Sequence, residues 1–172
     1  MSENKKPDKA QQFIRYVLDN CLRDKGFAAR LRRADNPATE YQSWELLATF
    51  NIPIEFDHPR LPYLLVAAAV ARAKADQNGS CSLGAAIAAC YEEGANSDQA
   101  KARLRRLLAC DDTAEVCRIL RGVLSLIQSK TRQTLDYERL LKQLLQFGRD
   151  NQRVKAQWAQ EFYHRPVEEE QV

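Results

Sequence analysis

Apolar residues recur every three or four positions along most of the chain. In the C-terminal half, stripes of this kind occupy residues 100–108, 116–127, 137–145 and 154–162. This spacing places the apolar side chains on one face of an α-helix, so each stripe predicts an amphipathic helix. The predicted N-caps are hydroxyl or carboxylate side chains, at Ser82, Ser97, Asp112 and Asp136. Glu115, three residues after one of these caps, predicts a variant of the capping box.

The N-terminal half has the same helical spacing, interrupted more often by glycine and proline. Apolar stripes predict helices over residues 13–21, 41–48, 59–75 and 83–93. The second of these helices is predicted to begin at Asn36-Pro37, and FNIPIEFDHPR is predicted to be a loop because proline interrupts helical hydrogen bonding. Trp44 and Trp158 both fall on apolar stripes, which predicts that both indoles are buried.

No segment has the alternating pattern of a strand, and no internal repeat is present. The sequence therefore predicts an all-α protein, a compact multi-helix bundle that can divide into two helical sub-bundles. A chain of 172 residues is long enough to bury a substantial core. The predicted organisation is a flexible N-terminus, an N-terminal sub-bundle, a basic C-terminal sub-bundle and an acidic disordered tail, at residues 1–9, 10–95, 96–165 and 166–172.

Neither a membrane span nor a secretory signal is predicted. The longest apolar run, residues 64–71, is much shorter than the roughly 20 residues that a spanning helix needs. The N-terminal residues MSENKKPDK lack an apolar signal core. We therefore expect a cytoplasmic protein without a membrane partner.

The residue types that catalysis and metal binding require are scarce. The five cysteines form no CxxC pair, and the only histidines are His58 and His164. Free, buried thiols are expected, rather than a disulfide framework or a metal site. No phosphate-binding glycine loop or zinc-protease motif is present. The sequence predicts no catalytic residue, no metal and no cofactor, so the chain is not expected to be an enzyme.

Charge is distributed unevenly along the chain. Residues 1–96 contain 12 Lys and Arg against 12 Asp and Glu, whereas residues 97–165 contain 14 against 8. The segment PVEEEQV then adds three glutamates. A basic C-terminal half beside a neutral N-terminal half indicates an anionic partner.

The basic residues lie opposite the leucine stripes of three successive predicted helices, or on their flank in the case of Arg103. These outward-facing cations are Arg103, Arg106, Arg118, Arg121, Arg139 and Lys142, and Arg32, Arg33 and Arg60 add to them from the N-terminal half. Ser125, Gln128 and Gln146 extend the same faces with neutral hydrogen-bonding groups, a mixture that suits a phosphate backbone. For any one pair of these cations, a solvated helix face is the simpler interpretation. No exposed aromatic platform and no motif for reading sequence is identified.

Several segments, in order, resemble the small subunit of the type I-E CRISPR Cascade complex, the CasB family. The most telling is SCSLGAAIA at residues 80–88, in which SLGxAxA is a family hallmark. ARLRRLLACDD, LDYERLLKQL and WAQEFY follow at matching places, and ARLRRA and HPR precede it. The resemblance covers most of residues 10–165.

The resemblance implies a non-enzymatic, all-helical subunit of an RNA-guided antiviral surveillance complex. Its implied partners are the guide RNA, the target DNA as heteroduplex and displaced strand, other Cascade subunits and a second copy of itself. By position, basic sites of the family match Arg33, Arg60, Arg103 and Arg121, and a basic segment before the last helix holds Arg149, Arg153 and Lys155. Gly122 departs from the family, where a second arginine can follow Arg121.

The predicted function is therefore stabilisation of the R-loop and of the displaced strand through contacts to the nucleic-acid backbone. The alternative is a helical adaptor protein whose basic face binds acidic protein surfaces. For the nucleic-acid function, the logarithm of the binding constant for a single strand is expected to fall linearly with the logarithm of the salt concentration. For the adaptor function, no binding to single strands is expected at low salt.

Overall fold

The computed structural model describes residues 6–164. Within them the chain forms nine α-helices, which confirms the all-α prediction. The only bridge of strand type among these residues pairs Cys81 with Leu135. Residues 1–5 of the predicted flexible N-terminus, and the predicted acidic disordered tail at 166–172, lie outside the described residues.

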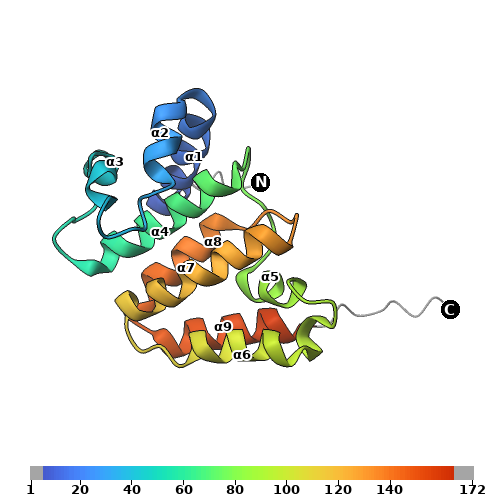
Figure 1. The fold of residues 1–172 in the computed structure, drawn as a ribbon. Helices are drawn as coiled ribbons and strands as arrows, with labels where there is room; N and C mark the ends of the chain where they lie inside the picture. The colour runs from blue at the N-terminus through green and yellow to red at the C-terminus, as the bar shows by residue number, and fades with distance from the viewer. Residues whose placement is uncertain (1–5, 165–172) are drawn as a thin grey trace, which may run out of the picture.

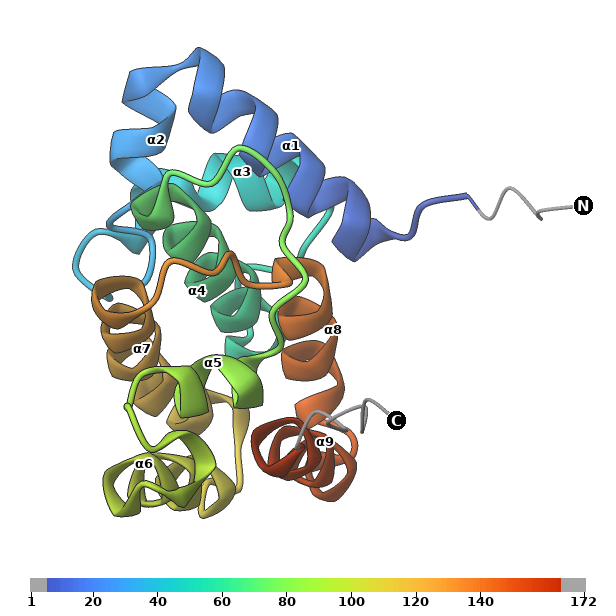
Figure 2. The same cartoon turned by 90° about the vertical axis from the view of Figure 1, so that its right-hand side faces the viewer.

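The helices are stacked in three layers (Figures 1 and 2). The central layer consists of α4 (Asp57–Ala73), α7 (Thr113–Lys130) and α8 (Tyr137–Phe147), and α4 packs against both of the others. One outer layer contains α1 (Lys9–Arg23), α2 (Lys25–Leu31), the 3₁₀ turn η1 (Glu40–Ser43) and α3 (Trp44–Thr49). The other contains α5 (Leu83–Ala89), the 3₁₀ turn η2 (Gly94–Asn96), α6 (Asp98–Leu108) and α9 (Asn151–Tyr163).

All four predicted N-caps are confirmed. The caps are Ser82, Ser97, Asp112 and Asp136. The side chain of each accepts a hydrogen bond from the backbone N–H of the residue three positions later. Glu115 departs slightly from the predicted capping box, because its carboxylate accepts from the N–H of Asp111, at 3.1 Å, rather than from that of the cap residue. These local bonds explain why helix starts were readable from the sequence.

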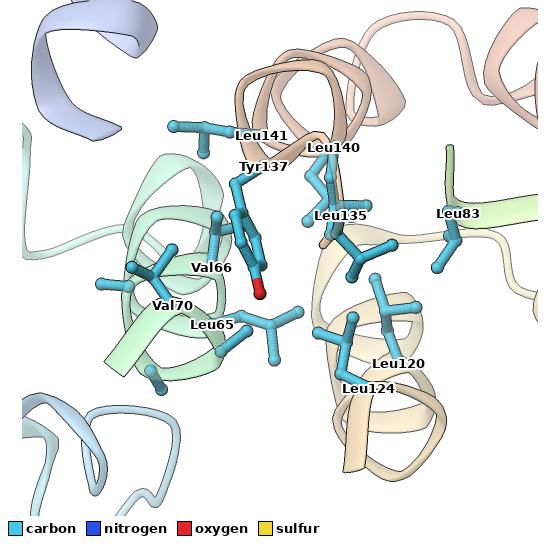
Figure 3. Packing of buried hydrophobic residues seen from close by; sticks show 14 of the residues in the cluster. Leu65, Val66, Val70, Leu83, Leu120, Leu124, Leu135, Tyr137, Leu140 and Leu141 are labelled. Carbon is cyan, nitrogen blue, oxygen red and sulfur yellow. The ribbon is translucent and has the colours of Figure 1, made fainter. Parts of the chain in front are cut away.

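One hydrophobic core extends through all three layers, from Ala10 to Phe162. Figure 3 shows its middle, where Tyr137 of α8 lies between Val66 of α4 and Leu124 of α7. Burial raises the pKa of the Tyr137 hydroxyl to about 12. The division into sub-bundles at residue 95 stays a prediction, and α5, which lies before that boundary, packs mainly on α9.

One of the two tryptophan predictions is confirmed and the other is wrong. Trp158 is fully buried, but Trp44 is 38% exposed and donates its Nε1 hydrogen to Glu40, at 3.4 Å. The predicted helix from Asn36 does not form, because turns and a 3₁₀ turn occupy residues 36–43. The helix therefore begins only at Trp44, and its buried face carries Leu46 and Leu47.

Candidate nucleic-acid interface

Two arginines from different helices converge on Asp35, in the turn after α2. The Asp35 side chain is only 2% exposed and forms a two-pronged ion pair with Arg72 of α4. Arg121 of α7 approaches the same carboxylate, with Nε 3.5 Å from Oδ2. A two-pronged arginine–carboxylate pair fixes both position and orientation, so Asp35 holds three segments in one arrangement.

Two further hydrogen bonds complete this junction. Arg72 also donates to the backbone carbonyl of Arg32, at 2.8 Å. Gln128 of α7 donates to the carbonyl of Arg72, at 2.5 Å. The C-terminal end of α2 is therefore attached to α4, and the C-terminal end of α4 to α7. Four predicted site residues are next to this junction along the chain. Arg32 and Arg33 come just before Asp35 in the same turn, and Arg118 lies about one helical turn before Arg121 on α7. We call these four arginines the Asp35 cluster.

The arginines of the Asp35 cluster face solvent. Arg32, Arg33 and Arg118 are exposed and make no ion pair with any described residue, while the Arg121 side chain is 45% exposed. The carboxylate at the centre, Asp35, is already neutralised by Arg72. The cluster is therefore a net positive surface, available to an anion such as a phosphate diester.

Arg60, another predicted site residue, is committed to contacts within the protein. Its side chain is 16% exposed and binds Glu40 at 3.1 Å and Asp57 at 3.0 Å. It also donates to the carbonyl of Ile54, at 2.8 Å. These bonds attach η1 to the start of α4. As a nucleic-acid contact Arg60 stays a prediction, and its observed contacts position the neighbouring turn.

Arg103 and Arg106 lie on a separate face. Both are exposed on α6, in the outer layer opposite α2, and neither pairs with a described acid (Figure 1). The predicted orientation of this helix is correct, because Leu104 and Leu107 are fully buried beneath them. The structure therefore does not bring the α6 arginines together with the Asp35 cluster.

The remaining candidates lie on α8, on α9 and between them. Arg139 pairs with Glu161 at 3.1 Å and Lys142 with Asp8 at 3.0 Å. Lys155 is 12% exposed and lies 3.6 Å from Asp111. Arg149 and Arg153 are exposed and unpaired among the described residues. The pairs partly neutralise this third basic surface, which leaves two of its five cations without an acid.

The residues that organise the Asp35 cluster were missed in the sequence. Neither Asp35 nor Arg72 was among the site residues predicted from the sequence. Nothing local pairs them, because they are 37 positions apart in the chain. The charge of Arg72, set within the alanine-rich end of α4, is the one signal that pointed to a partner inside the fold.

The histidine and cysteine side chains of the described residues are spread over the fold. No group of three or more histidines, cysteines or acids gathers at a metal-binding distance among them. The Nδ1 atom of His58 lies 3.2 Å from the hydroxyl of Thr113. The pKa of His58 is lowered mainly by burial and also by the positive charge of the nearby Arg149. Burial raises the pKa of the Cys117 thiol to about 12, so it is not a nucleophile at neutral pH.

A membrane span is also not found in residues 6–164. None of the helices described there has both the length and the apolar character needed to cross a bilayer.

Similarity to known proteins covers most of the chain. The sequence model of the CRISPR-associated protein Cse2 family matches residues 28–163. The crystal structure of M. ruber CasB is similar, with 26% identity, a TM-score of 0.69 and coverage of 92% of this chain and 94% of that chain. A CRISPR-associated protein of the Cse2 family from Thermus thermophilus has 23% identity and a TM-score of 0.72, over 90% of this chain and 97% of its own.

A chain from a CRISPR RNA-guided surveillance complex has the same fold, at 22% identity and a TM-score of 0.67, over 90% of this chain and 89% of that one. No curated protein sequence matches the chain. The family match begins within α2 and ends with α9, so it includes every predicted site residue from Arg32 to Lys155. The chain belongs to the Cse2/CasB family of CRISPR-associated proteins, as the resemblance in its sequence indicated.

Proposed function

We propose that this Cse2-family chain is a non-catalytic subunit of a type I-E Cascade complex that binds nucleic-acid backbone through the Asp35 cluster. The proposed partners are the guide RNA, the target DNA, the other Cascade subunits and a second copy of the chain. The role is to stabilise the R-loop and the displaced strand. It requires positioned positive charge and no chemical step.

The observation that carries the proposal is the arrangement of arginines around Asp35. Arg33 and Arg118 are far apart in the sequence and in different layers, yet Arg33 is in the same turn as Asp35 and Arg118 lines the same groove as Asp35. The ion pair of Asp35 with Arg72 attaches the turn that carries Arg33 to α4, and the bond of Gln128 to the Arg72 carbonyl attaches α7, which carries Arg118. Arg33 and Arg118 are both exposed. When a strand binds such a surface, its phosphates are neutralised by the arginines and its counterions are released. This binding requires no rearrangement of the protein.

Such contacts are sufficient to affect R-loop formation. Replacing DNA pairing by guide pairing is nearly balanced in free energy, so contacts to the strand backbone can shift the equilibrium. Phosphate contacts carry no sequence information, which suits a complex whose specificity comes from the guide. The exposed arginines of α6 and of the α8–α9 region are proposed as secondary contacts to other strands or subunits.

The direct test replaces Arg33 and Arg118 together by glutamate. Both are exposed and unpaired among the described residues, so the fold is expected to persist. Binding of the full chain to a single-stranded oligonucleotide is measured over a range of salt concentrations. Loss of two phosphate contacts is expected to make the slope of log K against log salt shallower by roughly 1.4.

The matched control is Arg15→Glu with Arg23→Glu, which changes the net charge by the same amount. Both arginines are exposed on α1, and α1 contributes nothing to the Asp35 cluster. The control is expected to bind much as the wild type does. An equal loss of binding in both double variants would attribute the effect to net charge alone and would refute the assignment of the site. Unchanged binding in the cluster variant would favour the adaptor function.

A further inference from the structure

Beside the Asp35 cluster lies a groove that the backbone contacts do not use. It has a volume of about 240 Å³ and lies between the turn at residues 34–37, helix α4 and helix α7. Leu61, Leu64 and Leu65 of α4 line it, together with Ala114 and Cys117 of α7. Arg118 and Arg121 line the α7 side. The groove therefore places an apolar hollow within one helical turn of two arginines.

The two acids at the groove do not repel an anion. Asp35 is neutralised by Arg72, and Glu40 is bound to Arg60 at 3.1 Å. Arg118 has no acidic partner among the described residues. Arg121 and Arg72 both contact Asp35, and Arg72 is the nearer of the two to the carboxylate. The groove thus combines an apolar interior with excess positive charge.

We infer that this groove takes one unstacked base of a single-stranded nucleic acid, while Arg118 and Arg121 bind the adjoining phosphates. A nucleotide matches this arrangement, because its flat, weakly polar base suits the apolar interior of the groove and its anionic phosphate suits the two arginines. Ligand pockets are typically apolar with a few placed polar groups, and extruded bases enter pockets lined by apolar side chains. The inference rests on the proposed function and adds to it a site for the base.

A base that is paired in a duplex cannot enter such a hollow, so the groove selects single strands. This selection suits the displaced strand, whose bases have lost their partners. Asn36 also lines the groove; its Oδ1 accepts a hydrogen bond from the N–H of Ala38, which leaves the Nδ2 hydrogens for the edge of a base. An apolar side chain of an acidic protein is the other occupant that the charges permit. In such a protein the carboxylates are not bonded to the apolar side chain, whereas in every nucleotide the phosphate is fixed covalently beside the base.

The test fills the groove and leaves the arginines intact. Ala114 is exposed and lines the groove, so Ala114→Leu occupies the hollow without entering the core. Binding is compared between an oligothymidylate and the same strand with its bases removed. The wild type is expected to prefer the strand with bases by roughly fivefold or more. In Ala114→Leu that preference is expected to disappear, while binding to the abasic strand is unchanged.

Ala102→Leu, an exposed position on α6, is the matched control and is expected to retain the preference. A wild type without preference overturns the inference. An Ala114→Leu variant that keeps the preference also overturns it, because the exposed Tyr41 and Trp44 would then account for base stacking. If Ala114→Leu leaves strand binding unchanged but weakens assembly with other Cascade subunits, the occupant is protein and the inference is wrong. If the inference fails but both strands still bind in a salt-dependent way, the proposed function stands. If neither strand binds in a salt-dependent way, both the inference and the proposed function are refuted.

Discussion

Asp35 is a nearly buried charge on which two arginines from different helices converge. Arg72 binds it through both terminal nitrogens, and its own side chain is 24% exposed. Arg121 is held more loosely, at 3.5 Å. The tight pair therefore has a structural role and the loose one leaves a guanidinium free to rotate toward a ligand. In the proposed function, this buried carboxylate positions the binding surface without belonging to it.

Replacing Asp35 by alanine is expected to destabilise the protein. Removing one member of a fully buried ion pair typically costs about 3–5 kcal/mol, and the partial exposure of Arg72 reduces the expected loss to about 2 kcal/mol. The measurement is the free energy of unfolding from urea denaturation. Asp19→Ala, at an exposed position on α1, is the control. A loss below about 0.5 kcal/mol for Asp35→Ala would show that the pair does not hold the junction.

Individual arginines of the cluster were predictable, but their shared location was not. The helical spacing identified Arg118 and Arg121 as outward-facing, because the side on which a helical residue lies depends on its near neighbours alone. The pairing of Asp35 with Arg72 depends on how α2 docks on α4, which no local pattern records. The environment of Arg60 escaped prediction for the same reason, since its partner Glu40 is 20 positions away.

Helix α5 shows why the SLG motif has a glycine. A Cβ atom on Gly84 would lie 2.4 Å from the carbonyl oxygen of Trp158 and 2.5 Å from the backbone nitrogen of Phe162. These are main-chain atoms of α9 and cannot move aside as a side chain can. The glycine therefore allows α5 and α9 to pack with their backbones in close approach. The hallmark noted in the sequence has a packing role in this chain.

Gly84→Ala is expected to separate α5 from α9 and to lower the free energy of unfolding by about 1–3 kcal/mol, the usual range for overpacking. Gly122→Ala is the matched control, because Gly122 lies in α7 and a Cβ atom added there would meet no atom within 4 Å beyond its chain neighbours and the nearby backbone of α7. There alanine is expected to stabilise the helix by about 0.5–1 kcal/mol. Thermal and urea denaturation of both variants provide the comparison. Two variants of equal stability would contradict the close-packing account.

The helices were more predictable than the connection between α2 and α3. Caps such as Asp112 and Asp136 bond to the backbone three residues ahead, so their effect is visible in a short window of sequence. Residues 36–43 instead follow contacts made across the fold, including the bond of Glu40 to Arg60. A helix that began at Asn36 was therefore predicted where turns occur.

The fold brings together basic residues that lie far apart in the sequence. By residue number the chain has a neutral half and a basic half, yet the Asp35 cluster draws Arg32 and Arg33 from the first and Arg118 and Arg121 from the second. The basic half does not form one continuous surface, because α6 and α9 lie in the layer opposite α2 (Figure 2). Counting charges along the chain thus indicated an anionic partner but not where it binds.

R-loop formation by the assembled Cascade complex tests the central claim most directly. The complex carries the wild-type chain, the Arg33→Glu and Arg118→Glu double variant, or the α1 control with Arg15→Glu and Arg23→Glu. Opening of the displaced strand is followed by chemical footprinting as salt is raised. The account predicts that the cluster variant assembles normally but opens the target several-fold less than the control at low salt. The difference is expected to narrow as salt rises, because the lost contacts are the salt-sensitive ones. A cluster variant that assembles and opens the target as fully as the wild type would contradict the account.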